Sequence, residues 1–122
     1  MSFSSIHTGK QGEDLAAAYL TQAGYRILER NYRCLFGEID IVAEEGDVLA
    51  FVEVKSRRSA AYGDPQLAVG PRKQMKISRI AMHYLGERRM GHCPARFDVL
   101  SVMLLPAGPR IELIRNAFEM AS

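Results

Sequence analysis

The order of helical and strand-like segments in this 122-residue sequence predicts an α/β protein with one mixed sheet flanked by helices. A helical segment precedes three strand-like runs, which are joined by short turns. A second helical segment separates the third run from a fourth, and a fifth run follows a turn rich in proline and glycine. Because a helix between two strands forms a crossover, we expect the third and fourth strands to lie parallel, with that helix on one sheet face.

The first helix is expected over residues 8–24. Thr8 is a candidate N-cap, two acids follow in the first turns, and Gly24 is a stop signal. The alternating run YRILERNYRC, residues 25–34, then predicts the first strand.

The stretch GEIDIVAEEGDVLAFVEVKSRR predicts the next two strands, over residues 38–43 and 48–56. An acidic turn that contains Gly46 joins them as a hairpin. Residues 57–70 contain glycine and proline and have no extended periodicity, so we expect a mobile loop there.

The second helix is expected to begin at Pro71, which suits a first helical turn, and to end at Gly86 or Gly91. The run ARFDVLSVMLLP predicts the fourth strand and RIELIRN the last, with a turn over residues 106–109. Because the chain is short and has no repeats or linkers, we expect a single domain over residues 1–122.

Composition excludes several classes of protein. The content of 48% hydrophobic and 25% charged residues is that of a globular protein. No apolar run approaches the roughly 20 residues that a membrane span needs, and the N-terminal segment lacks the apolar core of a secretory signal. Cys34 and Cys93 lack CxxC spacing, which favours reduced thiols over a zinc site. We therefore expect a cytoplasmic protein with no membrane partner.

Charge is distributed unevenly along the chain. Residues 1–54 hold four basic residues against nine acidic ones, whereas residues 55–89 hold nine basic residues against two acidic ones. The last third is balanced. A basic middle segment favours a polyanionic partner, although charge runs also occur on solvated helix faces.

Charged side chains lie inside the two strands of the hairpin, where core residues would be apolar. Because strand side chains alternate between faces, Glu38 and Asp40 share one face of the second strand, and Glu53 and Lys55 share one face of the third. The opposite face of the second strand is expected to carry Ile39, Ile41 and Ala43. In a hairpin, Asp40 can converge with Glu53 and Lys55, but the sequence leaves the register open.

Such a cluster has two interpretations. Two carboxylates brought close together repel each other unless a cation neutralises them. Oxygen ligands without cysteine or histidine favour Mg²⁺ or Mn²⁺, which can activate a water molecule and stabilise charge on a phosphoryl oxygen. With Lys55 to orient the attacking water, the spacing permits a site that cleaves phosphodiesters. The alternative is a ladder of surface salt bridges, which is common on exposed strand pairs.

The pattern D-x(12)-E-V-K over residues 40–55 resembles the PD-(D/E)XK nuclease superfamily. The resemblance extends to Glu13 and to the segments FGEIDIV, FVEVKSRR, YGDPQLAV, KQMKISRIA and ARFDVL. Together, over residues 9–119, these are similar to the YraN-like family of small bacterial proteins. That family has an endonuclease-type fold related to archaeal Holliday-junction resolvases. The resemblance therefore implies a restriction-endonuclease-like αβββαβ core, which agrees with the element order predicted above.

The resemblance also implies roles for individual residues of the hairpin. Asp40, Glu53 and the Val54 carbonyl would ligate Mg²⁺ or Mn²⁺, and Lys55 would serve the attacking water and the scissile phosphate. The superfamily usually has a proline before the first aspartate. Ile39 stands there in this sequence, which weakens the motif name more than the mechanism.

Outside the hairpin, the resemblance implies catalytic roles for Glu13, as an acid that completes or supports the metal site, and for Gln74, as a polar residue that faces it. Each has a structural interpretation too. Glu13 would stabilise the helix dipole, and Gln74 would be a solvated helix residue. Asp98 interrupts an apolar strand and is interpreted as the structural partner of an arginine.

Basic residues that follow the third strand and line one face of the second helix are the candidate nucleic-acid contacts: Arg57, Arg58, Arg72, Lys73, Lys76 and Arg79. Contacts from such residues to phosphates predict binding that is sensitive to salt and indifferent to sequence.

Three functions remain open at this point. The first is a metal-dependent nuclease that acts on DNA, with structured or branched DNA as a candidate substrate. The second is a nucleic-acid-binding module on the same fold with little or no turnover. The third, a protein-interaction domain with a salt-bridged hairpin, is disfavoured by the basic middle segment. The complete set of Glu13, Asp40, Glu53 and Lys55 favours the first over the second. The sequence leaves open whether the chain forms a homodimer or needs an activating partner.

Overall fold

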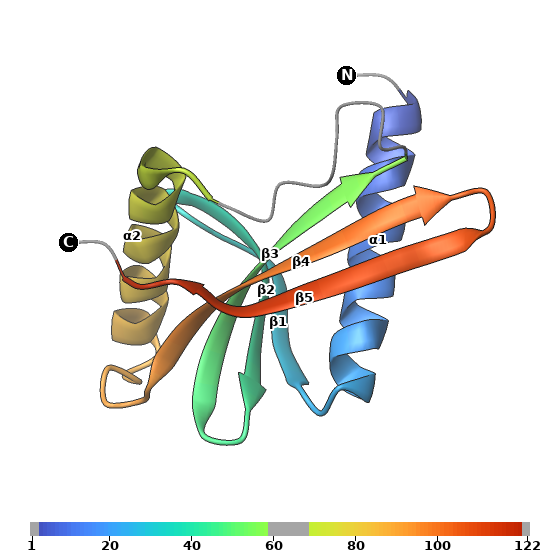
Figure 1. Ribbon diagram of the computed structural model, residues 1–122. Helices are drawn as coiled ribbons and strands as arrows, with labels where there is room; N and C mark the ends of the chain where they lie inside the picture. The colour runs from blue at the N-terminus through green and yellow to red at the C-terminus, as the bar shows by residue number, and fades with distance from the viewer. Residues whose placement is uncertain (1–2, 59–68, 121–122) are drawn as a thin grey trace.

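The computed structural model describes residues 3–58 and 69–120, with side chains described from residue 9 onward. The described residues form two helices and a five-stranded sheet (Figure 1). Along the chain the elements are α1 (Phe3–Gln22), β1 (Arg26–Cys34), β2 (Gly37–Glu45), β3 (Val48–Arg57), α2 (Pro71–Glu87), β4 (Ala95–Leu105) and β5 (Gly108–Phe118).

The sheet is mixed, as predicted. Its strands lie in sequence order, with β1, β2 and β3 forming an antiparallel meander and β5 pairing antiparallel to β4. β3 and β4 pair in parallel across the crossover that contains α2. The predictions of an α/β fold and of the parallel pair are therefore confirmed.

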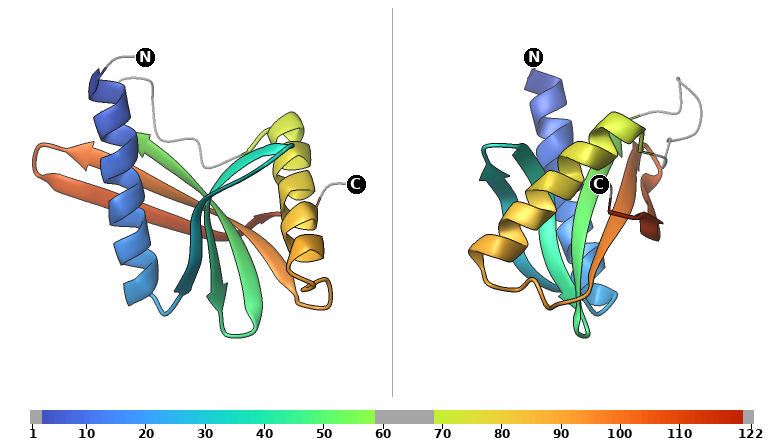
Figure 2. Two further views of the ribbon diagram at one scale, coloured as in Figure 1. Left: turned by 180° about the vertical axis from the view of Figure 1, so that it is seen from behind. Right: turned by 90° about the vertical axis from the view of Figure 1, so that its left-hand side faces the viewer.

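Helices cover both faces of the sheet, and Figure 2 shows this from behind and from the side. Each helix has its own set of buried partners. The α1-side cluster consists of Ala16, Leu20, Tyr25, Ile41, Ala43, Ala50, Val52, Leu100 and Val102. The α2-side cluster consists of Tyr32, Ile39, Val42, Leu49, Phe51, Val69, Ile77, Ile80, Ala81, Tyr84, Leu85, Phe97 and Val99. Burial on both faces explains why the central strands are nearly continuous apolar runs.

α1 approaches the sheet closely because Gly12 faces β3. A Cβ atom at Gly12 would collide with the Ser56 side chain, so only glycine fits there. Ala16 and Leu20 continue the buried stripe at intervals of four residues. The helix begins at Phe3, so the predicted start near Thr8 is wrong. The preceding segment contains neither proline nor glycine to stop it.

β1 ends at Cys34, as predicted, where it pairs with Gly37 of β2. β2 and β5 are longer than predicted, over Gly37–Glu45 and Gly108–Phe118, because their pairing with neighbouring strands continues to these residues. β3 continues to Arg57, which pairs with Met103 of β4, so Arg57 belongs to the sheet and not to the predicted loop. Most of that predicted loop, residues 59–68, lies outside the described residues.

Two further expectations concern the membrane and the cysteines. Neither described helix is long and apolar enough to cross a membrane. Both cysteines are free thiols, as expected.

A buried carboxylate ties together the elements at one end of the sheet. Asp98 of β4 accepts hydrogen bonds from the Tyr25 hydroxyl at 2.8 Å, from Arg96 Nε at 2.9 Å and from the Asn116 backbone amide at 2.9 Å. These donors come from the α1–β1 connection, from β4 itself and from β5. The prediction that Asp98 is the structural partner of an arginine is confirmed.

Glu45 extends this network to the surface. It accepts hydrogen bonds from Arg96 and Arg115, each at 2.8 Å, so Arg96 bridges Glu45 and Asp98. The bonds from Arg115 and Arg96 lower the pKa of Glu45 to about 2. Burial and the bond to Asp98 raise the pKa of Tyr25 to about 12.

Asp98→Ala is expected to lower the free energy of unfolding by about 3–5 kcal/mol, because it removes a buried carboxylate that accepts hydrogen bonds from Tyr25, Arg96 and Asn116, and leaves Arg96 with Glu45 as its remaining carboxylate partner. Urea unfolding measures this change. Asp47→Ala, which removes an exposed carboxylate from the β2–β3 turn, is the matched control and should change stability by less than about 0.5 kcal/mol. A loss below about 1 kcal/mol for Asp98→Ala would contradict the anchoring role.

Candidate functional site

The two strands of the acidic hairpin separate at Asp40. Their antiparallel ladder runs from the Glu45–Val48 pair to the Ile41–Val52 pair. Asp40 is the next residue of β2, and there the Val54 backbone amide donates a 2.7 Å hydrogen bond to Asp40 Oδ2. A side-chain carboxylate therefore takes the place of a backbone acceptor where the strands part.

Side-chain alternation changes at the same level of the sheet. Ile39 packs in the α2-side cluster, whereas Ile41 packs in the α1-side cluster, so the prediction that they share one face is wrong. Their partners on β1 are Tyr32 and Arg30, and between these two lies Asn31, with φ of 55°. A residue in this left-handed conformation interrupts the two-residue alternation of a strand.

Asp40 lies within electrostatic range of acids carried by three elements of the fold. Glu13 lies on α1, Glu53 lies on β3, and Glu38 lies on the same strand as Asp40. We call these four residues the acid cluster. Burial raises the pKa of Asp40 to about 7, although the hydrogen bond from Val54 acts in the opposite direction. The charges of the three other acids raise it further.

Glu53 has a cationic partner. Lys73, in the first turn of α2, places its Nζ 2.8 Å from Glu53 Oε1, and the Glu53 side chain is only 13% exposed. Lys55 lies near both residues, and its pKa is lowered by burial and then by the Lys73 charge. Lys73 was expected to contact phosphate. The structure instead pairs it with a candidate metal ligand, and a tertiary contact of this kind has no signal in the sequence.

The other acids near Asp40 have arginine partners. Glu13 lies 3.6 Å from the Arg30 guanidinium, and the Glu38 carboxylate accepts a 2.8 Å hydrogen bond from Arg33 Nε. The surface salt bridges of the alternative interpretation are therefore present at Glu13 and Glu38, which lie at the edge of the acid cluster.

Gln74 lies at the start of α2, but its side chain is engaged by the backbone. Its Nε2 donates a 2.6 Å hydrogen bond to the Val69 carbonyl. This bond connects the first turn of α2 to Val69, two residues before the helix begins.

Three of the predicted phosphate contacts form a stripe on the exposed face of α2. Arg72, Lys76 and Arg79 follow one another at intervals of three or four residues, and all are exposed. No described residue forms an ion pair with any of them, so within the described part of the chain the stripe is a run of positive charge without carboxylate partners.

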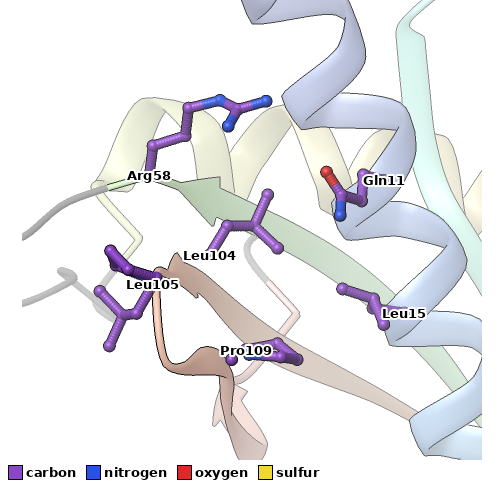
Figure 3. Close-up of a pocket in the computed structure, with 8 residues that line it drawn as sticks. Gln11, Leu15, Arg58, Leu104, Leu105 and Pro109 are labelled. Atoms are coloured by element: carbon purple, nitrogen blue, oxygen red, sulfur yellow. The ribbon is translucent and has the colours of Figure 1, made fainter.

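Arg57 and Arg58 are separate from this stripe. Arg57 is the last residue of β3. Arg58 lines a cavity of about 510 Å³ between α1 and the β4–β5 turn, together with Gln11 and Leu104 (Figure 3). The basic residues thus lie in two groups, and that of Arg58 is on the α1 side of the sheet.

Asp40 and Glu53 are the carboxylates that could hold a metal ion. Among the residues that the structure describes, no three acidic, histidine or cysteine side chains are close enough to form a metal-binding group. A site with two carboxylates and the Val54 carbonyl would fit Mg²⁺ or Mn²⁺, since these cations often take one or two carboxylates and complete their coordination with water and phosphate oxygens. The absence of sulfur and imidazole from this set disfavours zinc.

Comparison with known proteins gives a family. Residues 12–102 match the sequence model of the uncharacterised protein family UPF0102. The chain is 64% identical to a UPF0102 protein of Syntrophus aciditrophicus over 117 residues, which are 96% of this chain and 92% of that protein. It is 57% identical to a UPF0102 protein of Geobacter sulfurreducens, over 93% of this chain and 89% of the relative. A UPF0102 protein of Moorella thermoacetica is 46% identical over 97% of this chain and its own entire length.

Asp40→Asn is expected to raise the melting temperature at pH 8 by a few degrees in the absence of divalent cations, and to raise it less or not at all at pH 4. The reason is that the pKa of Asp40 is about 7 when folded and near 3.8 when unfolded. Stability is therefore lost as the pH rises through this interval, because the buried carboxyl group must ionise. The asparagine removes the charge and keeps an acceptor for the Val54 amide.

Differential scanning calorimetry at the two pH values measures this effect. Asp47→Asn in the exposed β2–β3 turn is the control and should show no such pH dependence. Equal shifts at both pH values in Asp40→Asn would show that the carboxyl group is not held in a charge-disfavouring environment.

Proposed function

The chain belongs to the uncharacterised protein family UPF0102, and we propose that it is a metal-dependent nuclease that hydrolyses DNA phosphodiesters, with structured or branched DNA as its substrate class. We also propose that its αβββαβ core belongs to the PD-(D/E)XK endonuclease-like superfamily. The observation that carries both proposals is the buried Asp40 carboxylate, held by the Val54 amide where β2 and β3 part and surrounded by three other acids.

A cluster of this kind stabilises no fold by itself. Glu13, Glu38 and Glu53 each have a cationic partner, but an ionised Asp40 carboxylate buried near them still opposes folding unless a further cation compensates it. Proteins accept such an arrangement chiefly at sites with a function. We therefore assign Asp40, Glu53 and the Val54 carbonyl as ligands of Mg²⁺ or Mn²⁺. When bound, the cation would neutralise the carboxylates and supply Lewis-acid stabilisation to the phosphate.

The other roles belong to side chains of the chain itself. Lys55 orients the attacking water and contacts the scissile phosphate. Glu13 supports the site from α1, within electrostatic range of Asp40. Gln74 acts as a positioning residue, because its bond to Val69 fixes the start of the helix that carries Lys73.

Phosphates on either side of the cleaved bond would be held by cations. The α2 stripe of Arg72, Lys76 and Arg79 contacts one segment of the backbone, and Arg57 and Arg58 contact another. Such contacts bind any sequence and weaken as salt rises. The two free cysteines fit the reducing cytoplasm, where we place this activity.

One observation favours the alternative of a binding module with little or no turnover. The Lys73 ammonium already compensates Glu53, and among the described residues no third acidic, histidine or cysteine side chain joins the two carboxylates in a metal-binding group. In that case the basic stripe would bind nucleic acid. The acid cluster would have no catalytic role, and Lys73 would neutralise the charge of Glu53.

Titration calorimetry with Mn²⁺ and with Mg²⁺ is expected to detect binding to the wild-type chain, weakened at least tenfold in Asp40→Asn and in Glu53→Gln, because each variant removes one anionic ligand. Asp47→Asn removes an acid outside the cluster and should bind as the wild type does. Unchanged affinity in both cluster variants would eliminate the metal site.

Cleavage of labelled duplex, single-stranded and four-way-junction DNA in Mn²⁺ tests the reaction itself. We expect cleavage by the wild type and a rate at least about 100-fold lower for Lys55→Ala, which is the scale of a lost proton-transfer or orienting group. Arg110→Ala removes an exposed cation from β5, the opposite edge strand to β1, and is the control. If nothing is cut while binding persists and weakens steeply with salt, the protein is the binding module.

A further inference from the structure

The turn between β1 and β2 has an unusual composition. Cys34 pairs with Gly37, so Leu35 and Phe36 alone form the connection. Two-residue turns favour glycine, asparagine and aspartate, and here both positions are apolar. Leu35 is 81% exposed, the highest fraction of any large apolar side chain in the described part of the chain, and Phe36 is 39% exposed. We call these two residues the turn tip.

The turn tip lies beside the basic stripe of α2, as Figure 1 shows for the ribbon. The Lys76 side chain passes over Gly37, where a Cβ atom would collide with Lys76 Cε. The Phe36 ring contacts the His83 ring edge-on, with centroids 6.2 Å apart. Gly37 has φ of 135°, a conformation that side chains disfavour, so the turn favours glycine at this position.

The same surface leads to the acid cluster. Gly37 begins β2 three residues before Asp40. On α2, Lys73 precedes Lys76 by about one turn and pairs with Glu53. α2 therefore contacts the turn tip through His83 and the carboxylates through Lys73, and most of the basic stripe lies between these two contacts along the helix.

We propose that the turn tip is a wedge that stacks against an unpaired nucleobase at a branch or fork in DNA, next to the phosphodiester that the acid cluster would cleave. The proposal rests on the proposed function for its substrate. An exposed apolar tip bordered by cations matches a ligand that has an apolar face and adjacent negative charges. An unstacked base with its flanking phosphates has both features.

A continuous duplex lacks the first of these features. Its bases are stacked on one another, so a wedge gains contact only where stacking is already broken or weak. The turn tip would thus favour branched or frayed DNA without reading any sequence, while the stripe would bind the backbone of either substrate.

The test compares a forked DNA that carries 2-aminopurine at the branch with a continuous duplex of the same length, in EDTA so that no strand is cut. The wild type is expected to bind the fork roughly tenfold more tightly than the duplex and to change the 2-aminopurine fluorescence. The double variant Leu35→Ala/Phe36→Ala should lose the preference and the fluorescence change while keeping its salt-sensitive affinity for duplex. Ile114→Ala, which removes an exposed apolar side chain from β5 at the opposite edge of the sheet, should behave as the wild type does.

Several results would overturn the wedge. One is equal affinity of the wild type for fork and duplex, and another is an unchanged preference in the double variant. A third is self-association of the wild type in sedimentation, abolished by the double variant and unaccompanied by fork preference, which would assign the tip to a second copy of the chain. Cleavage in Mn²⁺ is assayed in parallel. Cutting without fork preference rejects the wedge alone, and fork preference without cutting rejects the nuclease alone.

Discussion

The hydrogen bond from the Val54 amide to the Asp40 carboxylate determines how the centre of this protein is built. β2 and β3 are interior strands, covered on both faces by helices, so a simple end to their pairing would leave backbone donors unsatisfied within the sheet. The carboxylate accepts one such donor and lets the two strands part without that loss. The same bond holds Asp40 in a position where burial disfavours the ionised carboxylate. The proposed function rests on this unfavourable burial, which a bound cation would compensate.

The hydrophobic core, through the two helices, brings the partners of this carboxylate into place. On α1, Gly12 and Ala16 allow the helix to lie close to the sheet, and Glu13 follows Gly12 directly. On α2, Ile77 and Ile80 anchor the helix to the other face, and this sets Lys73 against Glu53. Apolar burial on both faces is a larger favourable contribution to folding than charge clustering is an unfavourable one. The fold can therefore maintain an electrostatic arrangement that its charges alone would not favour.

The residue pattern of the sequence predicted those features of the fold that depend on short-range periodicity and on the order of the elements. The order of helices and strands along the chain, the parallel pairing across the α2 crossover and the pairing of Asp98 with an arginine follow from periodicity, from the crossover connection and from the need to satisfy a buried acid. The side of the sheet that Ile39 faces could not be predicted in this way, because the alternation of β2 changes between Ile39 and Ile41, beside the left-handed Asn31 of β1. After glycine, asparagine is the residue that most readily takes the left-handed conformation. Asn31 was therefore the residue in the sequence that could have indicated an irregularity at this point of the sheet. Lys73 and its partner Glu53 are some twenty residues apart in the sequence, and their contact depends on how α2 docks on the sheet. Residue periodicity does not predict such a contact.

Charge balance at the site links the pairing of Lys73 to the proposed function. One ammonium group compensates one carboxylate, and in this structure the Lys73 ammonium compensates Glu53, while Asp40 accepts a hydrogen bond from a backbone amide. A divalent cation shared by Asp40 and Glu53 would compensate both, and the Lys73 charge would then be available to the anion nearest to it. In the proposed complex that anion is a DNA phosphate, and the stripe that begins at Arg72 would already hold its neighbours. The sequence-based expectation that Lys73 contacts phosphate and the observed pair with Glu53 are thus compatible as two states of one side chain, which differ in whether a metal ion is bound.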